Sequence, residues 1–552
     1  MLAYLVWNAL YFLSFTVDDA FISFRYARNL AEGLGPVYNP GERVEGFSSF
    51  SYVMLAAAFL RLGMPLLLSM KVFGLACAVG VALASHQLCR RLFAPAPWAP
   101  HAALLCLALI CMHTSLALWS QAGLETVFFS LLIVLSVWRF EVERDGGRAP
   151  WSAVLVWLLV ITRPEAPLYL AYFALRFFGA RRNPGVVKDA LLWLGVLLVL
   201  VPAYEWWGWS YYGAWLPNTH AAKVGAASLG PAGDGESFRG ARYLLGFLKD
   251  HGWGFWVLLG LGAAGAVIPG PAPRDVRRPL AIYAPVLSGL AFVYYAGADW
   301  MPRHRFFVPF LPLLLAAVSF GVFRLRSSVR ARRSLALPLL LVTAVSVGHY
   351  AYSQSFGSAE STSKRKGHEA RAARGWWPAQ VPERVTHVRY PFATLAVEAT
   401  TTVRTGEWIS LPDIGFVGYL TDNPVWDQLG LVTVAAARAR NNAADDGFQA
   451  AIDDLLSRDP AMIVERSATG AAFLNSFYAA LRRDPRMRER YETDGPFEPF
   501  YPRVHRRRGA EDFDAQGQLD WALSRLENPG TLRDDGGLVP LGTGPTARGN
   551  RE

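Results

Sequence analysis

The chain has 552 residues, of which 53% are hydrophobic and 18% are charged, and its mean hydropathy is +0.22. Ordinary soluble domains contain roughly 25% charged residues, so this composition excludes a disordered chain. Several apolar runs are long enough to cross a bilayer and indicate a polytopic membrane protein. The net charge of +10 comes from basic residues that lie mostly between the apolar runs, which favours membrane topology over nucleic-acid binding.

The apolar runs and turn signals predict about eleven membrane crossings. They lie near residues 1–16, 66–89, 101–119, 124–140, a broken pair around 151–178, then 189–209, 252–269, 279–297, 306–323 and 335–351. The first run lacks a basic leader and an A-x-A cleavage site, so we expect a membrane helix rather than a signal peptide.

Arginines concentrate in alternate loops, which the positive-inside rule assigns to the cytoplasm. The intervening segments are therefore expected to face outward. They are residues 17–65, 120–123, 163–165, 210–251, 297–305 and the C-terminal 200 residues. Six tryptophans and tyrosines between Trp206 and Trp215 lie where this map places an outer interface, as an aromatic belt would.

The composition changes near residue 353 to short alternating strands and helices, with strand-like runs at 408–411 and 461–464 and a helical run at 451–456. We therefore expect a membrane domain over 1–352, a small extracytoplasmic α/β domain over 353–529 and a disordered tail over 530–552.

Two adjacent carboxylates, Asp18 and Asp19, open a predicted helix directly after the first apolar run. Apolar residues at 20, 21, 24, 27 and 31 give this helix one apolar face, and Gly33 is a suitable stop, so it should lie on the membrane surface. Ionised groups at such a junction are costly unless they have partners or a function. The alternative is that Asp19 is an N-cap and Asp18 only a first-turn charge.

Adjacent helical residues point about 100° apart, so the two carboxylates cannot act as a face-to-face dyad. One carboxylate can act as the base while the other orients that base. A phosphate leaving group needs no acid, so one base with cationic stabilisation suffices for a transfer reaction that displaces phosphate.

Cations on the same expected outer side could hold a lipid phosphate: Lys223, Arg303 and Arg305. The alternative is that they snorkel to the headgroups. Arg303 and Arg305 also violate the positive-inside rule, which favours a specific role. The charges of Glu125 and Arg163 could line a polar cavity or form a structural ion pair.

Neither the histidines nor the cysteines of this sequence predict a metal centre. His220 and His304 lack partners at metal-ligand spacing, and the four cysteines all lie in or beside apolar runs without zinc-site spacing. No disulfide framework is expected in the outward domain. No cofactor is therefore assigned, although a divalent metal ion at the Asp18–Asp19 pair remains open.

Six segments resemble the GT-C class of integral-membrane glycosyltransferases, and more narrowly the branch containing the mycobacterial terminal arabinofuranosyltransferases. They are DDAFISFRYARNLAEGLGPVYNPGERVEGFSS (18–49), AGLET (122–126), TRPE (162–165), YYGAWLPNTHAAKVG (211–225), GADWMPRHRFFVP (297–309) and PDIGFVGYLTDNPVWDQLGL (412–431). The resemblance implies a polyprenyl-phosphate sugar donor and an acidic base in the first outer loop, which maps to Asp18 or Asp19. It also implies that the donor phosphate binds among outer-face basic residues, for which Lys223, Arg303 and Arg305 are the candidates by position.

The expected function is sugar transfer, inverting, from this donor to a cell-envelope glycan, lipid or protein at the outer face of a bacterial plasma membrane. Further polar side chains are expected in the substrate cavity: Arg25, Glu125, Arg163, His220, Asp299 and His304. In the outward domain, Asp413 and Trp426 either shape the acceptor cleft or serve the scaffold. The rival functions are a transporter or flippase of a lipid-linked sugar and a non-catalytic membrane scaffold.

Overall fold

The computed structural model describes residues 1–94, 96–144, 149–179, 184–222, 239–267, 279–297, 299, 301–329, 333–355, 390–441, 445–466, 472–494, 503–509 and 513–527. The tail over 530–552 lies outside these residues. The chain divides into two compact units, each made of separate segments. The first unit comprises Met1–Leu13, Lys71–Tyr204 and Asp234–Glu369, and the second comprises Ser14–Met70, Glu205–Gly233 and Ala370–Glu552. The expected boundaries at 352 and 529 stay a prediction.

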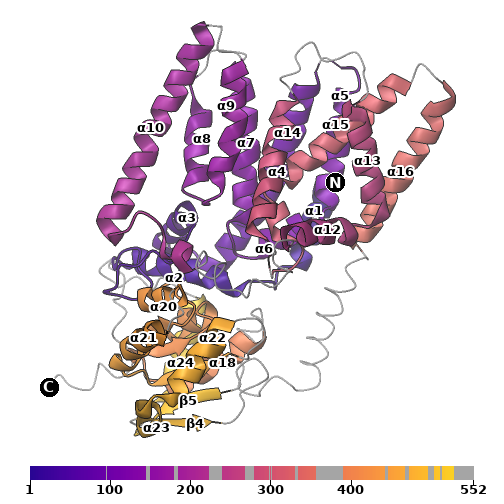
Figure 1. Ribbon diagram of the computed structural model, residues 1–552. Coiled ribbons are helices and arrows are strands. Elements are labelled where there is room, and N and C mark those ends of the chain that lie inside the picture. The colour runs from indigo at the N-terminus through magenta and orange to yellow at the C-terminus, as the bar shows by residue number, and fades with distance from the viewer. Residues whose placement is uncertain are drawn as a thin grey trace. The chain divides into compact units, whose positions relative to one another are not determined.

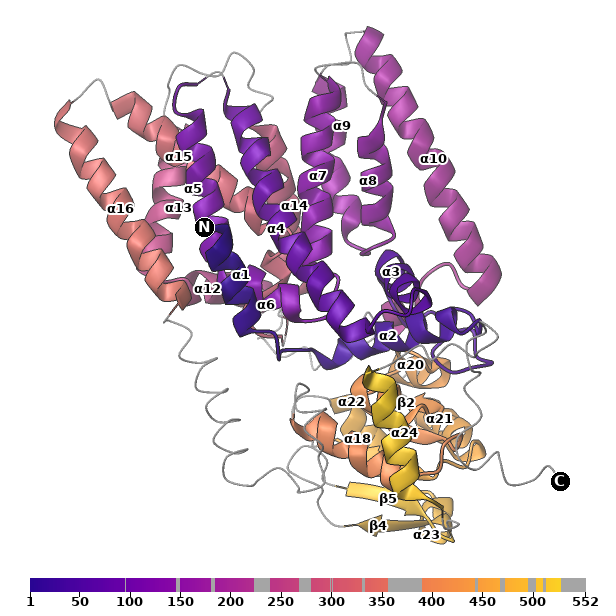
Figure 2. The same cartoon turned by 180° about the vertical axis from the view of Figure 1, so that it is seen from behind.

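The first unit is helical (Figures 1 and 2). Its helices are α1 (Leu2–Tyr11), most of α4 (Leu66–Phe93), α5 (Ala99–Met112), α6 (Thr114–Gln121), α7 (Thr126–Arg144), α8 (Trp151–Val160), η1 (Ala166–Tyr169), α9 (Leu170–Gly179), most of α10 (Pro184–Tyr212), α12 (Arg239–Asp250), α13 (Gly252–Val267), α14 (Leu280–Ala296), η3 (Arg305–Phe307), α15 (Leu311–Val329) and α16 (Arg333–Ser355).

Helices occur at each expected span, but eleven crossings are not confirmed. Among the described residues, three helices are long and apolar enough to cross a membrane, namely Leu66–Phe93, Gly185–Tyr212 and Leu311–Ser328. A fourth crossing results if α5 and α6, which bend by 54° at their break, form one span. Other apolar helices have 10–17 residues, fewer than the roughly 20 that a straight crossing needs.

Glycines allow very close packing of helices in the first unit. A Cβ atom on Gly265 of α13 would lie 1.7 Å from the carbonyl oxygen of Gly321 on α15, and one on Gly262 would lie 2.9 Å from Val318 Cα. Such small-residue contacts are typical of membrane helices, where close backbone approach replaces the hydrophobic effect as the source of association.

The second unit combines helices from the N-terminal third with a sheet from the C-terminal third. Its helices are α2 (Asp18–Ala31), α3 (Phe50–Arg61), α18 (Tyr390–Thr402), α19 (Phe416–Thr421), α20 (Val434–Asn441), α21 (Asp445–Ser457), α22 (Ala472–Arg483), α23 (Pro485–Arg490) and α24 (Ala515–Glu527). The strands are β1 (Ile409–Leu411), β2 (Val425–Asp427), β3 (Met462–Glu465), β4 (Tyr491–Asp494) and β5 (Arg503–Arg507).

The sheet order is β2-β1-β3-β5-β4, with β2, β1 and β3 parallel and β5 antiparallel to both β3 and β4. Both faces of β1, β2 and β3 are buried, as expected for parallel strands covered by helices. One face carries the core cluster with α20, α21 and α22, in which Trp426, Leu455 and Phe477 are almost fully buried. The expected small α/β domain and its strand-like runs are confirmed.

Helix α2 begins and ends near the predicted positions: it starts at Asp18, and Gly33 has a positive φ of 85° just beyond its end. Its N-cap is Val17, so the interpretation of Asp19 as the N-cap is wrong. The polar face of α2 is also buried, because α3 and α19 pack against the helix within the second unit. Its expected placement on the membrane surface stays a prediction.

Candidate functional site

Asp18 is held by the loop that joins β1 to α19. Its side chain is buried, with 7% of the residue exposed, and its two carboxylate oxygens accept hydrogen bonds from Phe416 N at 2.8 Å and Gly415 N at 3.1 Å. These amides lie at the start of α19, where backbone N–H groups lack partners within the helix. Asp18 therefore satisfies the end of a helix nearly 400 residues away in sequence.

Burial raises the pKa of Asp18 from its ordinary value to about 8. The negative charges of Asp413 and Asp19 raise the pKa further, whereas the hydrogen bonds from Phe416 and Gly415 oppose this change. Desolvation disfavours the charged form of a carboxyl, and nearby like charges act in the same direction. Asp18 thus combines a fixed position with the proton affinity that a general base needs near neutral pH.

Asp19 follows Asp18 in the first turn of α2 and is only half-buried. The two carboxylates share a helix end, where Asp18 is buried and accepts hydrogen bonds from the loop after β1, whereas Asp19 is half-buried. Different environments for adjacent carboxylates fit the expectation that one accepts a proton while the other supports it.

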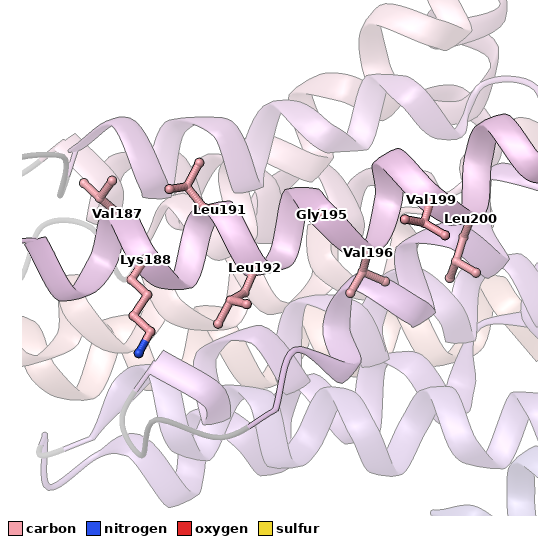
Figure 3. Close-up of a pocket in the computed structure, with 8 residues that line it drawn as sticks. All are labelled: Val187, Lys188, Leu191, Leu192, Gly195, Val196, Val199 and Leu200. Carbon is pink, nitrogen blue, oxygen red and sulfur yellow. The ribbon is translucent and has the colours of Figure 1, made fainter.

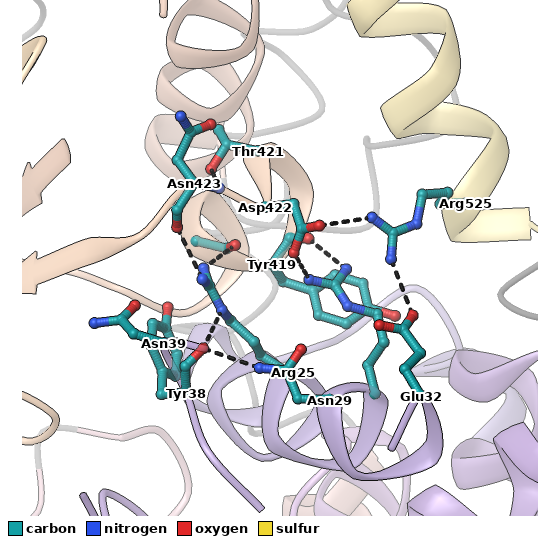
Figure 4. Close-up of polar contacts among 12 residues, drawn as sticks. Arg25, Asn29, Glu32, Tyr38, Asn39, Tyr419, Thr421, Asp422, Asn423 and Arg525 are labelled. Carbon is teal, nitrogen blue, oxygen red and sulfur yellow. Dashed lines mark hydrogen bonds and ion pairs between the residues drawn. The ribbon is translucent and has the colours of Figure 1, made fainter. Parts of the chain in front are cut away.

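Arg25 is a structural residue by its contacts. It is fully buried, and its guanidinium donates hydrogen bonds to three backbone carbonyls, those of Tyr38 at 2.8 Å, Gly418 at 2.6 Å and Asn423 at 2.8 Å (Figure 4). These donors are engaged within the protein, so the geometry supports a role in holding α2 to α19. It gives no support for the expected place of Arg25 in the substrate cavity.

An ion-pair network extends from the other end of α2. Arg28 pairs with Asp422, which also accepts from Arg525 of α24 at 2.9 Å, and Arg525 contacts Glu32 at 3.3 Å (Figure 4). Burial raises the pKa of Glu32 to about 7, against the opposing effect of both arginines. This network ties α2, α19 and α24 together.

In the first unit, the expected phosphate-binding loop has an unusual backbone. Arg303 and His304 are consecutive non-glycine residues with positive φ, 59° and 52°. Such backbone conformations cost about 1–3 kcal/mol each and concentrate at functional sites. Arg305 pairs with Asp299 at 2.8 Å, and its guanidinium lies 5.7 Å from the centre of the buried Trp119 ring. The loop thus holds four of the predicted site residues, Asp299, Arg303, His304 and Arg305.

His304 is held from the side of α12. Its Nε2 lies 2.8 Å from Asp250 Oδ2, and its ring packs edge-on against Phe247 and Tyr243. Its other ring nitrogen is buried without a hydrogen-bond partner among the described residues. His304 therefore lies in the same loop as the expected phosphate-binding arginines, and within the described part of the chain its Nδ1 accepts or donates no hydrogen bond.

Glu125 and Arg163 form an ion pair at 2.5 Å, and Arg163 also pairs with Glu165. All three side chains are largely buried. The observed contacts therefore match the structural ion pair that was the alternative to a polar cavity. A role for Glu125 and Arg163 toward substrate stays a prediction.

The structure gives little information on the roles of two other predicted residues, His220 and Lys223. His220 is exposed in a short segment whose main chain bonds to Pro217. Lys223 lies outside the described residues. The structure thus brings Arg303, His304, Arg305 and Asp299 together in the first unit and places Asp18 beside Asp19 and Asp413 in the second.

Trp426 lies in the core of the α/β domain, which matches the scaffold role that was one of its two expected roles. It is 1% exposed, stacks on Phe477 in the domain core and donates from Nε1 to Asp454 at 2.8 Å. Asp413 is different, because it is 15% exposed and pairs with Arg466 at 3.2 Å. The sequence analysis did not identify Arg466 as a functional residue. Its position after a strand-like run, like that of Asp413, is the feature that could have indicated it.

A buried histidine pair was also missed. His113, at the break between α5 and α6, has its Nε2 at 3.0 Å from His251 Nε2, while its Nδ1 accepts from Ser115 N. His251 Nδ1 lies 2.6 Å from the Phe247 carbonyl oxygen. Each histidine thus has both ring nitrogens occupied. No periodicity relates residues 138 positions apart, so the sequence carried no signal for this pair.

Among the residues described, no group of three or more His, Cys, Asp or Glu side chains is arranged to hold a metal ion. An open apolar recess of about 810 Å³ runs along α10 from Val187 to Leu200, with Lys188 as the charged residue of its lining (Figure 3). None of the predicted site residues lines this recess.

Two comparisons with known proteins bear on these features. A family described as "Domain of unknown function (DUF8728)" matches residues 383–513, which include the whole sheet. The chain is also 25% identical, over 345 residues, to the "Terminal beta-(1->2)-arabinofuranosyltransferase" of Corynebacterium glutamicum (strain ATCC 13032). That match covers 54% of this chain and 47% of the relative, so the chain spans about half of that protein's length. These similarities and the apolar helices indicate a membrane protein distantly related to a glycosyltransferase.

Proposed function

We propose that the protein is a membrane glycosyltransferase that moves a sugar from a polyprenyl-phosphate donor to a hydroxyl of a cell-envelope glycan, lipid or protein. The distant similarity to an arabinofuranosyltransferase supports transfer and makes arabinofuranose the first sugar to test. The observation that carries the proposal is the buried, doubly hydrogen-bonded Asp18, whose pKa of about 8 suits a general base.

In the proposed reaction, the acceptor hydroxyl gives its proton to Asp18, with Asp19 as the alternative base. The acceptor oxygen attacks the anomeric carbon from the face opposite the phosphate, so a new C–O bond forms with inversion. The bond between the anomeric carbon and the phosphate oxygen breaks, and polyprenyl phosphate leaves with the electron pair. No acid is required, because phosphate is a stable leaving group.

The departing phosphate gains negative charge and requires cations near it. Arg303, His304 and Arg305 are proposed for this role, together with Lys223. The positive φ values at Arg303 and His304 support it, because strained backbone of this kind is maintained where function needs it. Asp299 would then act by orienting Arg305, to which it is bonded.

We place the reaction at the outer face of a bacterial plasma membrane, with the α/β domain extracytoplasmic and the donor tail in lipid. The distribution of arginines among the loops supports this orientation. The divalent ion considered at Asp18 and Asp19 stays a prediction, which adding EDTA to the assay tests.

The test is sugar transfer by the purified protein in lipid nanodiscs with a panel of polyprenyl-phosphate sugars and envelope acceptors. Asp18→Asn and Asp19→Asn are compared with wild type and with Asp453→Asn, a surface carboxylate of the α/β domain, as the matched control. We expect transfer to fall by about 10²-fold or more in the variant that lacks the base and to persist in the control. The acid limb of the pH profile should lie near pH 8.

Transfer that survives both substitutions would contradict the proposed chemistry. If no donor is consumed but labelled lipid-linked sugar changes leaflet in liposomes, the protein is a transporter instead. If an unchanged cellular phenotype accompanies both substitutions, the scaffold function is favoured.

A further inference from the structure

The α/β domain reaches Asp18 through the loop Pro412–Phe416, which follows β1. This loop supplies both amides that bind the Asp18 carboxylate, and it contains Asp413. Gly415 approaches Asp18 closely, because a Cβ atom there would lie 2.1 Å from the Asp18 carbonyl oxygen and 2.4 Å from Asp18 Oδ2. The position of Asp18 is therefore fixed by this loop and not only by α2.

Asp413 and Arg466 meet at one edge of the sheet for a topological reason. Asp413 follows β1 and Arg466 follows β3, and these neighbouring strands are parallel, so their carboxyl ends lie together. The chain leaves β1 toward β2 on one side, while β3 lies on the other. Ligands and functional residues of α/β sheets collect at such switch points.

Among the described residues, the ionisable groups that act electrostatically on Asp18 include Asp19, Asp413 and Tyr38. Asp19 is its neighbour on α2, Asp413 lies on the loop after β1, and Arg466 after β3 pairs with Asp413 at 3.2 Å. Tyr38 also acts on Asp18 electrostatically, and its hydroxyl donates to the Ile414 carbonyl at 2.5 Å. Asp413 and Asp19 disfavour a charge on Asp18, and Arg466 compensates part of the charge of Asp413.

We propose that Asp413, held by Arg466, is a positioning residue of the α/β domain that sets how readily Asp18 takes up and releases its proton. This inference rests on the proposed function in assigning a consequence to that proton. It gives the domain of unknown function a role in the chemistry, since a carboxylate on its sheet edge adjusts the base on α2. The Arg466 contact offsets part of the Asp413 charge that acts on Asp18.

The proposal makes opposite predictions for the two partners. Asp413→Asn removes a like charge near Asp18 and should move the acid limb of the kcat/KM profile down by about one pH unit. Arg466→Gln removes one cation from the side of Asp413 and should move the limb up, while Arg466→Lys should restore the wild-type profile. Asp453→Asn and Arg486→Gln, which break another ion pair of the same domain, are the controls and should leave the limb unchanged.

A second readout follows the proton on Asp18 without any turnover. Infrared spectroscopy of the full protein in nanodiscs, titrated with pH, detects the protonated carboxyl band, which is assigned by its loss in Asp18→Asn. The midpoint of this band should fall in Asp413→Asn and rise in Arg466→Gln. If Asp18→Asn does not fold, ¹³C labelling of aspartate carboxyls identifies the band by its isotope shift and its response to Asp413→Asn.

The two readouts separate failure of the inference from failure of the proposed function. If the infrared midpoint does not move in either variant, Asp413 does not act on Asp18 and the inference is wrong. A rate that falls equally at every pH in both variants also overturns it, because that result indicates a purely structural ion pair. If the infrared midpoint moves in opposite directions while the rate profile stays fixed, the inference stands and Asp18 is not the base.

Discussion

At the scale of single residues, Arg25 has structural contacts, although its position in the sequence suggested a place in the substrate cavity. Arg25 lies beside the predicted catalytic pair, yet its guanidinium binds only backbone oxygens in the contacts described above. A guanidinium offers five donors in a fixed plane, which suits it to collecting several carbonyls at once. Proximity to a catalytic residue in sequence is therefore a poor guide to contact with substrate.

Arg25→Met tests this structural role. The variant leaves the carbonyls of Tyr38, Gly418 and Asn423 without their buried donor, so we expect a loss of about 3–5 kcal/mol in the free energy of unfolding. Arg488→Gln, at an exposed position of α23, is the control and should change stability by less than about 0.5 kcal/mol. Chemical unfolding followed by circular dichroism measures both, and equal stability of the two variants would contradict the assignment.

At the scale of elements, the helices were predictable, and so was the broken pair around 151–178, but the break at His113 was not. Periodic or continuous apolar runs locate α4, α10, α13 and α15, because local composition determines where a helix forms. The break at His113 involves a partner distant in sequence, since the His113 ring contacts His251, while its other nitrogen accepts locally from Ser115 N. For the same reason, the number of crossings could not be deduced from apolar runs alone.

The contact between α13 and α15 predicts a sharp difference between two glycines of one helix. At Gly265 an added Cβ would meet the backbone of Gly321 at 1.7 Å, whereas at Gly260 nothing lies within 4 Å. Gly265→Ala should therefore force the helices apart and destabilise the first unit by about 1–3 kcal/mol. Gly260→Ala should be neutral or stabilising by up to about 1 kcal/mol. Thermal unfolding in detergent measures both, and equal midpoints would refute this packing.

The outer edge of strand β2 forms hydrogen bonds with the side chain of Asn39. The Asn39 amide donates to the Val425 carbonyl and accepts from Val425 N, each at 2.9 Å, so it completes the hydrogen bonding of that residue. An unpaired edge strand would otherwise expose these groups. We interpret Asn39 as a cap on the sheet edge.

Asn39→Ala should remove this cap and speed amide hydrogen exchange at Val425, with a loss of about 1–3 kcal/mol in stability. Asn39→Asp retains an acceptor for Val425 N but sets a buried carboxylate against the Val425 carbonyl and Glu42, so it should destabilise at least as much. Hydrogen exchange read by mass spectrometry distinguishes the variants. Unchanged protection of Val425 in Asn39→Ala would show that the cap is dispensable.

At the scale of the whole molecule, the second unit depends on pairing segments almost 400 residues apart. Asp18 with Phe416, Arg25 with Asn423 and Asn39 with Val425 all join the first 40 residues to the α/β domain. The sequence indicated both segments separately, the first as a helix with two carboxylates and the second as a small sheet. Their mutual contact could not be predicted, because neither periodicity nor composition reports which distant segments meet.

Two carboxyls buried by this pairing make stability depend on pH. The pKa is raised to about 8 for Asp18 and to about 7 for Glu32, against roughly 4 in an unfolded chain. The folded protein therefore binds more protons than the unfolded chain between these values. The stability that protonation contributes is fully present below pH 4 and is lost as the pH rises through 7 and 8.

We accordingly expect the thermal unfolding midpoint of the full protein in nanodiscs to fall by several degrees between pH 5 and pH 9. Asp18→Asn combined with Glu32→Gln replaces both carboxyls by permanently neutral groups, so it should flatten this dependence. Asp453→Asn is the control, because the pKa of that exposed carboxyl is lowered and it stays ionised throughout the range. A profile that retains the wild-type slope in the double variant would show that the pH dependence arises elsewhere, and the buried carboxyls would then be ionised in the folded protein.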